Sequence, residues 1–193
     1  MSKMMPGMIG QLRGPQMKIG AALLVVAAII VGVAITVGDP WSRPINGVGG
    51  LCWLVAAGLL ALSVRGGERQ AIGWLATVGM VVVLVIAIRP SNLVAAILGF
   101  SVAGALIAVI MRDRPIRWAL LVAAMWLPAH LALAVGRVAL HGGGTVRTEP
   151  PPTAALVPMA MILAAGAGGL VIVWLRRRFV RGRAANLYAA PGR

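Results

Sequence analysis

The chain has 193 residues, of which 60% are hydrophobic and 11% are charged, and its formal net charge is +14. Soluble domains have about 45–50% apolar and about 25% charged residues, and a domain of this size must cover its core with polar surface. The composition therefore excludes an ordinary soluble domain and indicates an integral membrane protein.

Positive charge occurs in short clusters that separate long apolar runs. A nucleic-acid-binding protein gathers its basic residues on one soluble face, so no nucleic-acid partner is predicted. Arginine outnumbers lysine 16 to 2, a bias typical of GC-rich bacterial genomes, which favours a bacterial plasma membrane. Cys52 is the only cysteine, so an intramolecular disulfide and a Cys-based zinc site are excluded. We interpret Cys52 as a packing residue.

Residues 1–17 contain Pro6, Pro15 and three glycines. These residues disfavour a helix, so the segment is predicted to be a short cytoplasmic tail. The first apolar run, 19–37, carries no charge, and it is either a secretory signal peptide or an uncleaved signal anchor. A signal anchor is favoured because no A-x-A cleavage pattern follows and the run is longer than a signal-peptide apolar region.

Further apolar runs follow, separated by polar turns or loops, and a basic tail ends the chain. The shortest run is roughly 24 Å long at 1.5 Å per residue, so it is expected to begin early or to thin the bilayer locally. Together the runs predict an all-α fold in which about six transmembrane helices form an antiparallel bundle with successive helices as neighbours. The predicted segments are runs 48–63 (the shortest), 71–88, 93–111, 118–135 and 154–175, a long outer loop 136–153, the transmembrane domain 18–175 and the basic tail 176–193.

The distribution of Lys and Arg predicts that both termini are cytoplasmic. With the N-terminus inside, fourteen basic residues fall in inner segments and four in outer segments, which agrees with the positive-inside rule. Tryptophan prefers the membrane–water interface. Trp74, Trp118 and Trp174 are predicted at inner helix ends, and Trp41 and Trp53 near the outer boundary.

Two turn-to-helix segments, 68–74 and 112–118, resemble each other, since each places a tryptophan after a basic turn. An internal duplication would explain the likeness. Positive-inside charge followed by an aromatic anchor would produce it without common ancestry. The sequence leaves both explanations open.

Ionisable groups within a membrane are functional candidates because burying them is costly. The four carboxylates fall in predicted loops or at helix edges, so no carboxylate for ion coupling or acid–base chemistry is predicted in the middle of a span. They are Asp39, Glu68, Asp113 and Glu149.

His130 is the one ionisable residue inside a predicted span, and it lies near Trp126 and Pro128. Pro128 removes one helical hydrogen bond. The functional interpretation is a proton relay or ligand contact at a kink. The structural interpretation, which we favour, is a histidine that bonds to the freed backbone carbonyl or to a neighbouring helix. His141 alone is weak evidence for a metal site, which needs three or four ligands.

Two further groups of residues are candidates for packing or binding. Glycines in the fourth and sixth runs favour close helix packing, with a broken transporter helix as the alternative; they are Gly99, Gly104, Gly166, Gly168 and Gly169. A basic cluster in the tail favours contact with anionic lipid headgroups of the inner leaflet, with docking of a cytoplasmic partner as the alternative. Its members are Arg176, Arg177, Arg178, Arg181 and Arg183.

Motifs for metalloprotease, hydrolase, thiol redox and nucleotide-binding chemistry are not found in the sequence. We therefore expect neither an enzyme nor a bound cofactor or metal. The favoured hypothesis is a non-catalytic subunit or scaffold of a membrane complex, bound to a membrane-protein partner or to copies of itself. The alternative is a small transporter or permease component that works as an oligomer or beside a separate ATPase. An intramembrane enzyme is the third and least supported hypothesis.

Overall fold

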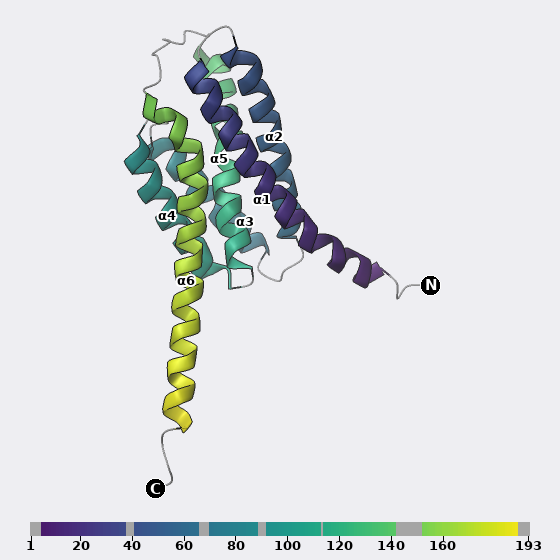
Figure 1. Ribbon diagram of the computed structural model, residues 1–193, viewed down its shortest axis with the longest axis vertical. Coiled ribbons are helices and arrows are strands. Elements are labelled where there is room, and N and C mark those ends of the chain that lie inside the picture. Colours follow the sequence, from purple (N-terminus) through teal and green to yellow (C-terminus); the bar gives the residue numbers. More distant parts are fainter. Residues whose placement is uncertain are drawn as a thin grey trace.

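The computed structural model describes residues 5–37, 41–65, 70–88, 92–112, 114–141 and 152–188, with side chains described in these ranges except at 5–14, 134, 137–141, 152 and 180–188. In this part of the chain every regular element is helical (Figure 1). The elements are α1 (Met5–Val37), α2 (Ser42–Ser63), α3 (Gln70–Ala87), α4 (Leu93–Ile110), α5 (Pro115–His141), the 3-10 helix η1 (Pro152–Leu156) and α6 (Val157–Tyr188).

Each of the six described α-helices contains a segment that is long and apolar enough to cross a membrane. By helix length and composition, the prediction of an all-α multi-pass membrane protein is confirmed. Many large apolar side chains point outward, including Leu75 and Ile86 of α3, which are 78% and 77% exposed. Such side chains are stable facing lipid, which is as apolar as they are.

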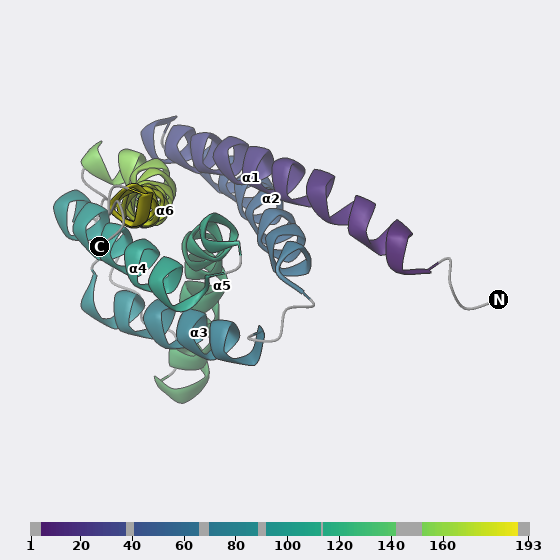
Figure 2. The same cartoon turned by 90° about the horizontal axis from the view of Figure 1, so that it is seen from below.

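The start of α1 differs from the prediction. The helix begins at Met5, so the expectation that residues 1–17 are not helical is wrong from Met5 onward. Pro6 is the second residue of the helix, where an amide N–H has no intrahelical acceptor, and proline costs little there. Pro15 lies inside the helix, yet extending a helix from a long apolar run costs far less than starting one. Figure 2 shows the first part of α1 extending away from the other helices.

Other boundaries also lie beyond the predicted runs, and α5 begins at Pro115, three residues before its run. Helix α2 begins at Ser42, which confirms the expected early start of the shortest run. Helix α5 continues to His141, into the predicted loop 136–153, and α6 continues to Tyr188 through most of the predicted basic tail. An apolar run ends at the first charges, whereas backbone hydrogen bonding continues through arginine, which is a good helix former.

Helix α5 occupies the centre of the bundle and contacts α2, α3, α4 and α6 (Figure 2). Helices α1 and α2 form one extensive pair, and α4 and α6 form another. In the described residues α2 and α3 share no close contact. The expectation that all successive helices are neighbours is therefore wrong for this pair, because α5 packs against both of them.

Glycine permits the close approach of α4 and α6. A Cβ atom on Gly104 would overlap the carbonyl oxygen of Ala165, and one on Gly168 would overlap that of Ser101. Each overlap is with backbone, which cannot rotate away as a side chain can. Both helices run unbroken through these glycines, so packing explains the two residues and a broken helix does not occur there.

Candidate functional site

The site begins with Pro128, which lies inside α5. Proline has no amide N–H, so the carbonyl of Ala124, four residues earlier, loses its helical donor. Trp53 of α2 supplies the missing donor, since its Nε1–H donates to the Ala124 oxygen at 2.8 Å. Trp53 is 1% exposed. The bond therefore satisfies a buried polar group and joins α2 to α5.

Trp126 and His130 are one helical turn apart on α5, and their rings are in tilted contact, with centroids 4.1 Å apart and an interplanar angle of 40°. Trp126 is 9% exposed, and its Nε1 atom is buried without an acceptor among the described residues. The side chain of His130 is half-buried. The structure thus brings together two of the three predicted residues, Trp126 and His130, and Pro128 lies between them in the helix.

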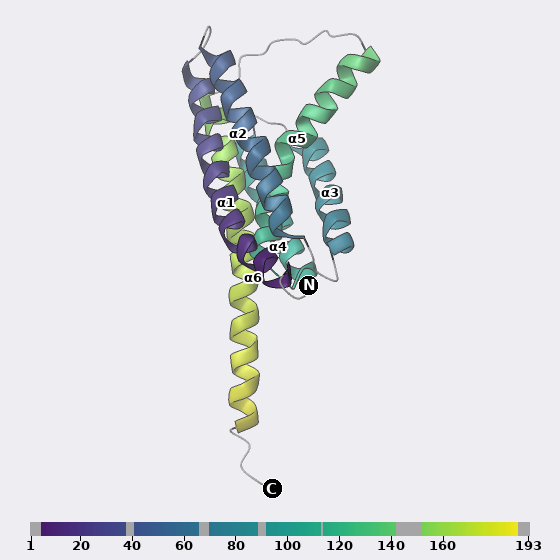
Figure 3. The ribbon, with the colours of Figure 1, turned by 90° about the vertical axis from the view of Figure 1, so that its right-hand side faces the viewer.

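Helix α5 changes direction in its second half, and its C-terminal part leans away from α1 and α2 (Figure 3). Proline is the usual cause of such a bend, and Pro128 is the proline inside this helix. Beyond the bend, Leu131, Leu133 and Val135 are 46%, 44% and 69% exposed. Trp126 and His130 therefore lie where α5 begins to separate from the bundle.

The nitrogen atoms of Trp126 and His130 supply an indole donor and an imidazole, which can bind a polar group but do not define a reaction. Comparison with protein-family models, curated proteins and solved structures found no match to this chain. Among the described residues, no group of three or more His, Cys, Asp or Glu side chains is placed to hold a metal ion. Cys52 packs against the apolar core, as predicted. The side chain of His141 lies outside the described residues.

The basic cluster of α6 divides into residues with different contacts. The Arg176 guanidinium donates from Nη2 to the carbonyl of Val109, in the last turn of α4, at 2.8 Å. The guanidinium carbon of Arg178 lies 5.3 Å from the centroid of the Trp174 ring, a cation–π distance. Arg177 is exposed. The side chains of Arg181 and Arg183 lie outside the described residues, although the α6 backbone continues past them.

Sequence reasoning missed a second set of contacts, at the end of α2. Arg114 and Arg117 both donate from Nη1 to the carbonyl oxygen of Ser63, each at 3.1 Å. The last carbonyls of a helix lack intrahelical donors and carry partial negative charge. The position of these arginines in the predicted turn indicated topology, but their pairing with a helix 51 and 54 residues earlier had no local signal.

The predicted belt of tryptophans is only partly correct. Trp41 and Trp174 are 67% and 56% exposed, as expected of interfacial side chains, but Trp53 and Trp118 are 1% and 2% exposed. Trp118 packs edge-on against Trp74, with ring centroids 5.8 Å apart. Trp53 and Trp118 are thus core residues. The sequence does not distinguish an interfacial tryptophan from a core tryptophan, since either can lie near a helix end.

Proposed function

We propose that the chain is a non-catalytic subunit or scaffold of a complex in the plasma membrane, with both termini in the cytoplasm and no reaction of its own. The six apolar helices give it the character of a multi-pass membrane protein. The observation that carries the proposal is the length of α6, which projects far beyond the ends of its neighbours (Figures 1 and 3).

The projecting part of α6 is long compared with the lipid headgroup layer. From Arg176, which binds the last turn of α4, to Tyr188 the helix rises about 18 Å at 1.5 Å per residue. The headgroup region adds only about 5–8 Å on each side of the hydrocarbon core. The end of α6 therefore extends past the headgroups, where its arginines suit the acidic surface of a protein partner.

Helix α3 supports the proposal from within the membrane. Only 22% of its spanning window is buried by the rest of the chain, compared with 44% for α6. Leu75 and Ile86 lie on its outer face. In a complex, this face is available to a helix of another membrane protein.

The test is photocrosslinking in native membranes, followed by purification of the full chain in mild detergent. With the crosslinking residue at Leu75 or Ile86, we expect one discrete product that contains a different protein. The same residue at Val55 of α2, which is 55% exposed, is the matched control and should give no discrete product. Crosslinks only between copies of this chain, or none at all, would overturn the proposal.

The role of the α6 arm is tested by Arg181→Gln with Arg183→Gln, which lie farther along the arm than Arg177 and Arg178. Less of the crosslinked partner should be recovered, because two cations are lost from the arm. Arg43→Gln with Arg147→Gln removes the same charge from segments predicted on the outer side and should leave recovery unchanged. Equal losses from the two pairs would show that the arm has no specific role.

A small transporter remains the second candidate, and the buried Nε1 of Trp126 at the bend of α5 favours it. A donor without a protein acceptor is costly in an apolar bundle, and a polar substrate or water would satisfy it. The test places a cysteine at the bend, His130→Cys in a Cys52→Ala background, and applies a membrane-impermeant maleimide. Labelling supports a water-accessible path, whereas a cysteine that stays unlabelled in intact membranes counts against a transporter.

A further inference from the structure

Two guanidinium groups are held side by side at the end of α2. Arg114 and Arg117, at the start of α5, both donate to the Ser63 carbonyl at 3.1 Å. Because they share one acceptor, their positive charges are fixed close together. A guanidinium has five N–H donors in a planar fork that matches phosphate oxygens, so Arg114 retains donors for a second acceptor.

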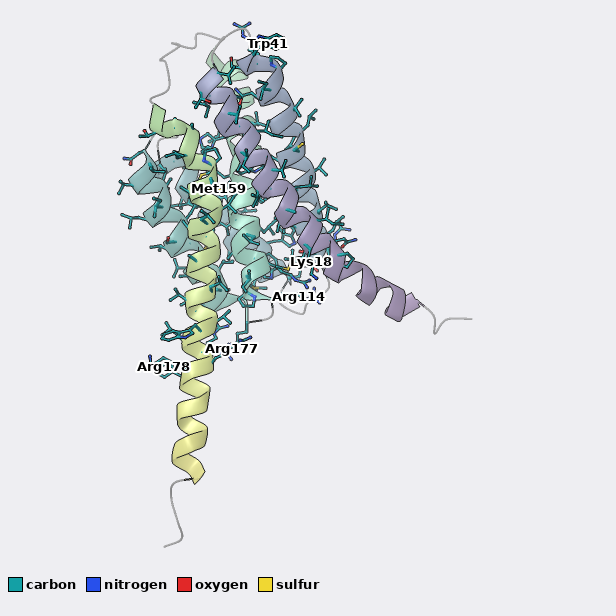
Figure 4. All side chains as sticks on the ribbon, in the orientation of Figure 1. Lys18, Trp41, Arg114, Met159, Arg177 and Arg178 are labelled. Atoms are coloured by element: carbon teal, nitrogen blue, oxygen red, sulfur yellow. The ribbon has the colours of Figure 1, made fainter. Side chains whose placement is uncertain are left out.

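A third cation, Lys18, lies at the same end of the bundle. A Cβ on Gly20 would lie 3.1 Å from Leu59 and 3.2 Å from Leu60, which fixes the register of α1 against α2. Lys18 is two residues earlier in α1, so its backbone lies at the level of the last turn of α2. Figure 4 shows Lys18 and Arg114 at this end, and both are exposed.

The backbone of Arg114 adopts an unfavourable conformation, and hydrogen bonds within the turn hold it there. Its φ is 61°, in the left-handed region that costs energy for a residue with a side chain. The following Pro115 restricts its backbone further. The Arg114 carbonyl accepts hydrogen bonds from the amides of Arg117 at 3.0 Å and Trp118 at 3.4 Å, which hold the turn in place.

The sequence segments around these arginines carry a net positive charge even when their acidic residues are counted. Segments 65–69 and 112–117 contain five arginines and two acidic residues, a net of +3, and Lys18 raises it to +4. Apolar side chains adjoin this charge, since Ile19 and Leu62 are 52% and 38% exposed. Cations beside exposed apolar surface match a molecule with an anionic head and an acyl chain.

We infer that Lys18, Arg114 and Arg117 form a binding site for the phosphodiester of an anionic phospholipid, whose acyl chain lies along Ile19 and Leu62. The arginines bind the phosphate while anchored to the Ser63 carbonyl, and Lys18 adds a third positive charge from α1. The site is separate from the α6 arm and does not depend on the proposed subunit role. It fixes one lipid at the junction of α1, α2 and α5.

The test is native mass spectrometry of the full chain in non-ionic detergent, titrated with phosphatidylglycerol or phosphatidylcholine. The chain should retain phosphatidylglycerol and not phosphatidylcholine. Lys18→Gln with Arg114→Gln should weaken retention about thirtyfold, the factor expected for two cations near an anionic headgroup. The matched control, Arg43→Gln with Arg147→Gln, removes equal charge from segments predicted on the outer side and should weaken it less than about threefold, because those residues lie outside the site.

Circular dichroism and gel filtration check that the variants fold. Since Arg114 also caps α2, Lys18→Gln alone is the second variant, and it should weaken retention about fivefold. Equal losses from the two double variants, or unchanged retention by Lys18→Gln, would overturn the site. Inorganic phosphate is added as a competitor in a further arm. Failure to displace the lipid supports the lipid assignment, and displacement at millimolar concentration would replace it with a soluble phosphate.

Discussion

The carbonyl of Ala124 is a polar group inside an apolar bundle, and its donor comes from a different helix. Pro128 creates the requirement and the indole of Trp53 meets it at 2.8 Å. Trp126 carries the same N–H group, also buried, but without an acceptor among the described residues. The two indole N–H groups therefore differ in free energy. The N–H of Trp53 makes a hydrogen bond that offsets its loss of hydration, whereas the N–H of Trp126 has lost hydration without gaining such a bond among the described residues.

Trp53→Phe should destabilise the chain by about 1–3 kcal/mol through the unsatisfied carbonyl alone. Trp126→Phe deletes a donor that bonds to no described residue, so it should cost less. Denaturant unfolding in detergent measures both. Pro128→Ala restores the helical donor to Ala124, and Trp53→Phe should then cost clearly less than it does in the parent chain. An equal cost in both backgrounds would show that the hydrogen bond contributes nothing.

The sequence predicted part of this site and not the rest. Trp126, Pro128 and His130 fall within five consecutive positions of one apolar run, so their proximity follows from helix geometry. The carbonyl that Pro128 frees was also predictable, and we expected His130 to bind either that carbonyl or a neighbouring helix. The donor is Trp53, which lies 71 positions away in the sequence. Only tertiary packing decides which of several tryptophans reaches it.

At the scale of elements, α4 and α6 cross through small residues, and one polar contact, from Arg176 to the Val109 carbonyl, joins them at the end of α4. At the crossing, Gly104 faces the backbone of Ala165 on α6, and Gly168 faces the backbone of Ser101 on α4. In lipid, such close approach is a main source of helix association, because apolar side chains gain little by leaving the lipid. The glycines indicated packing in the sequence, but the partner helix did not follow from them.

Gly168→Ala should weaken the α4–α6 pair by about 1–3 kcal/mol, the usual cost of overfilling a packed interior. Its Cβ would meet the carbonyl oxygen of Ser101, so the helices must move apart. Gly166→Ala is the control, because its Cβ meets only the Leu120 side chain at 3.8 Å. Thermal unfolding in detergent should separate the two variants. Similar melting temperatures would mean that the crossing tolerates a methyl group.

Helix existence was predictable, whereas the exact ends and the pairing were not. The runs at 71–88 and 93–111 match α3 and α4 to within one residue at each end. Their ends coincide with predicted polar turns whose sequences contain proline or glycine, which stop helices as well as apolar runs. At α6 the end of the apolar run and the end of the helix do not coincide, because arginine ends the apolar run but continues the helix. Asn92 marks the start of α4, where its side chain accepts from the Ala95 amide at 3.0 Å.

For the whole molecule, arginines gather at the end of the bundle where α2 and α4 terminate. Arg114 and Arg117 bind the end of α2, and Arg176 binds the end of α4. Helix C-termini attract cations through the helix dipole. The charge bias that predicts a cytoplasmic location for this end therefore also stabilises the helices that finish there.

The distribution of basic residues leads to a prediction about the orientation of the chain in the membrane. Both termini should lie in the cytoplasm, because fourteen of the eighteen basic residues then face inward. Fluorescent-protein fusions at residue 1 and after Arg193 should fluoresce, and a phosphatase that is active only outside the cytoplasm should be inactive there. The same phosphatase inserted after Gly143, in the predicted outer loop, should be active. Opposite results at the two termini would require an odd number of crossings, and one of the six helices would then lie outside the membrane.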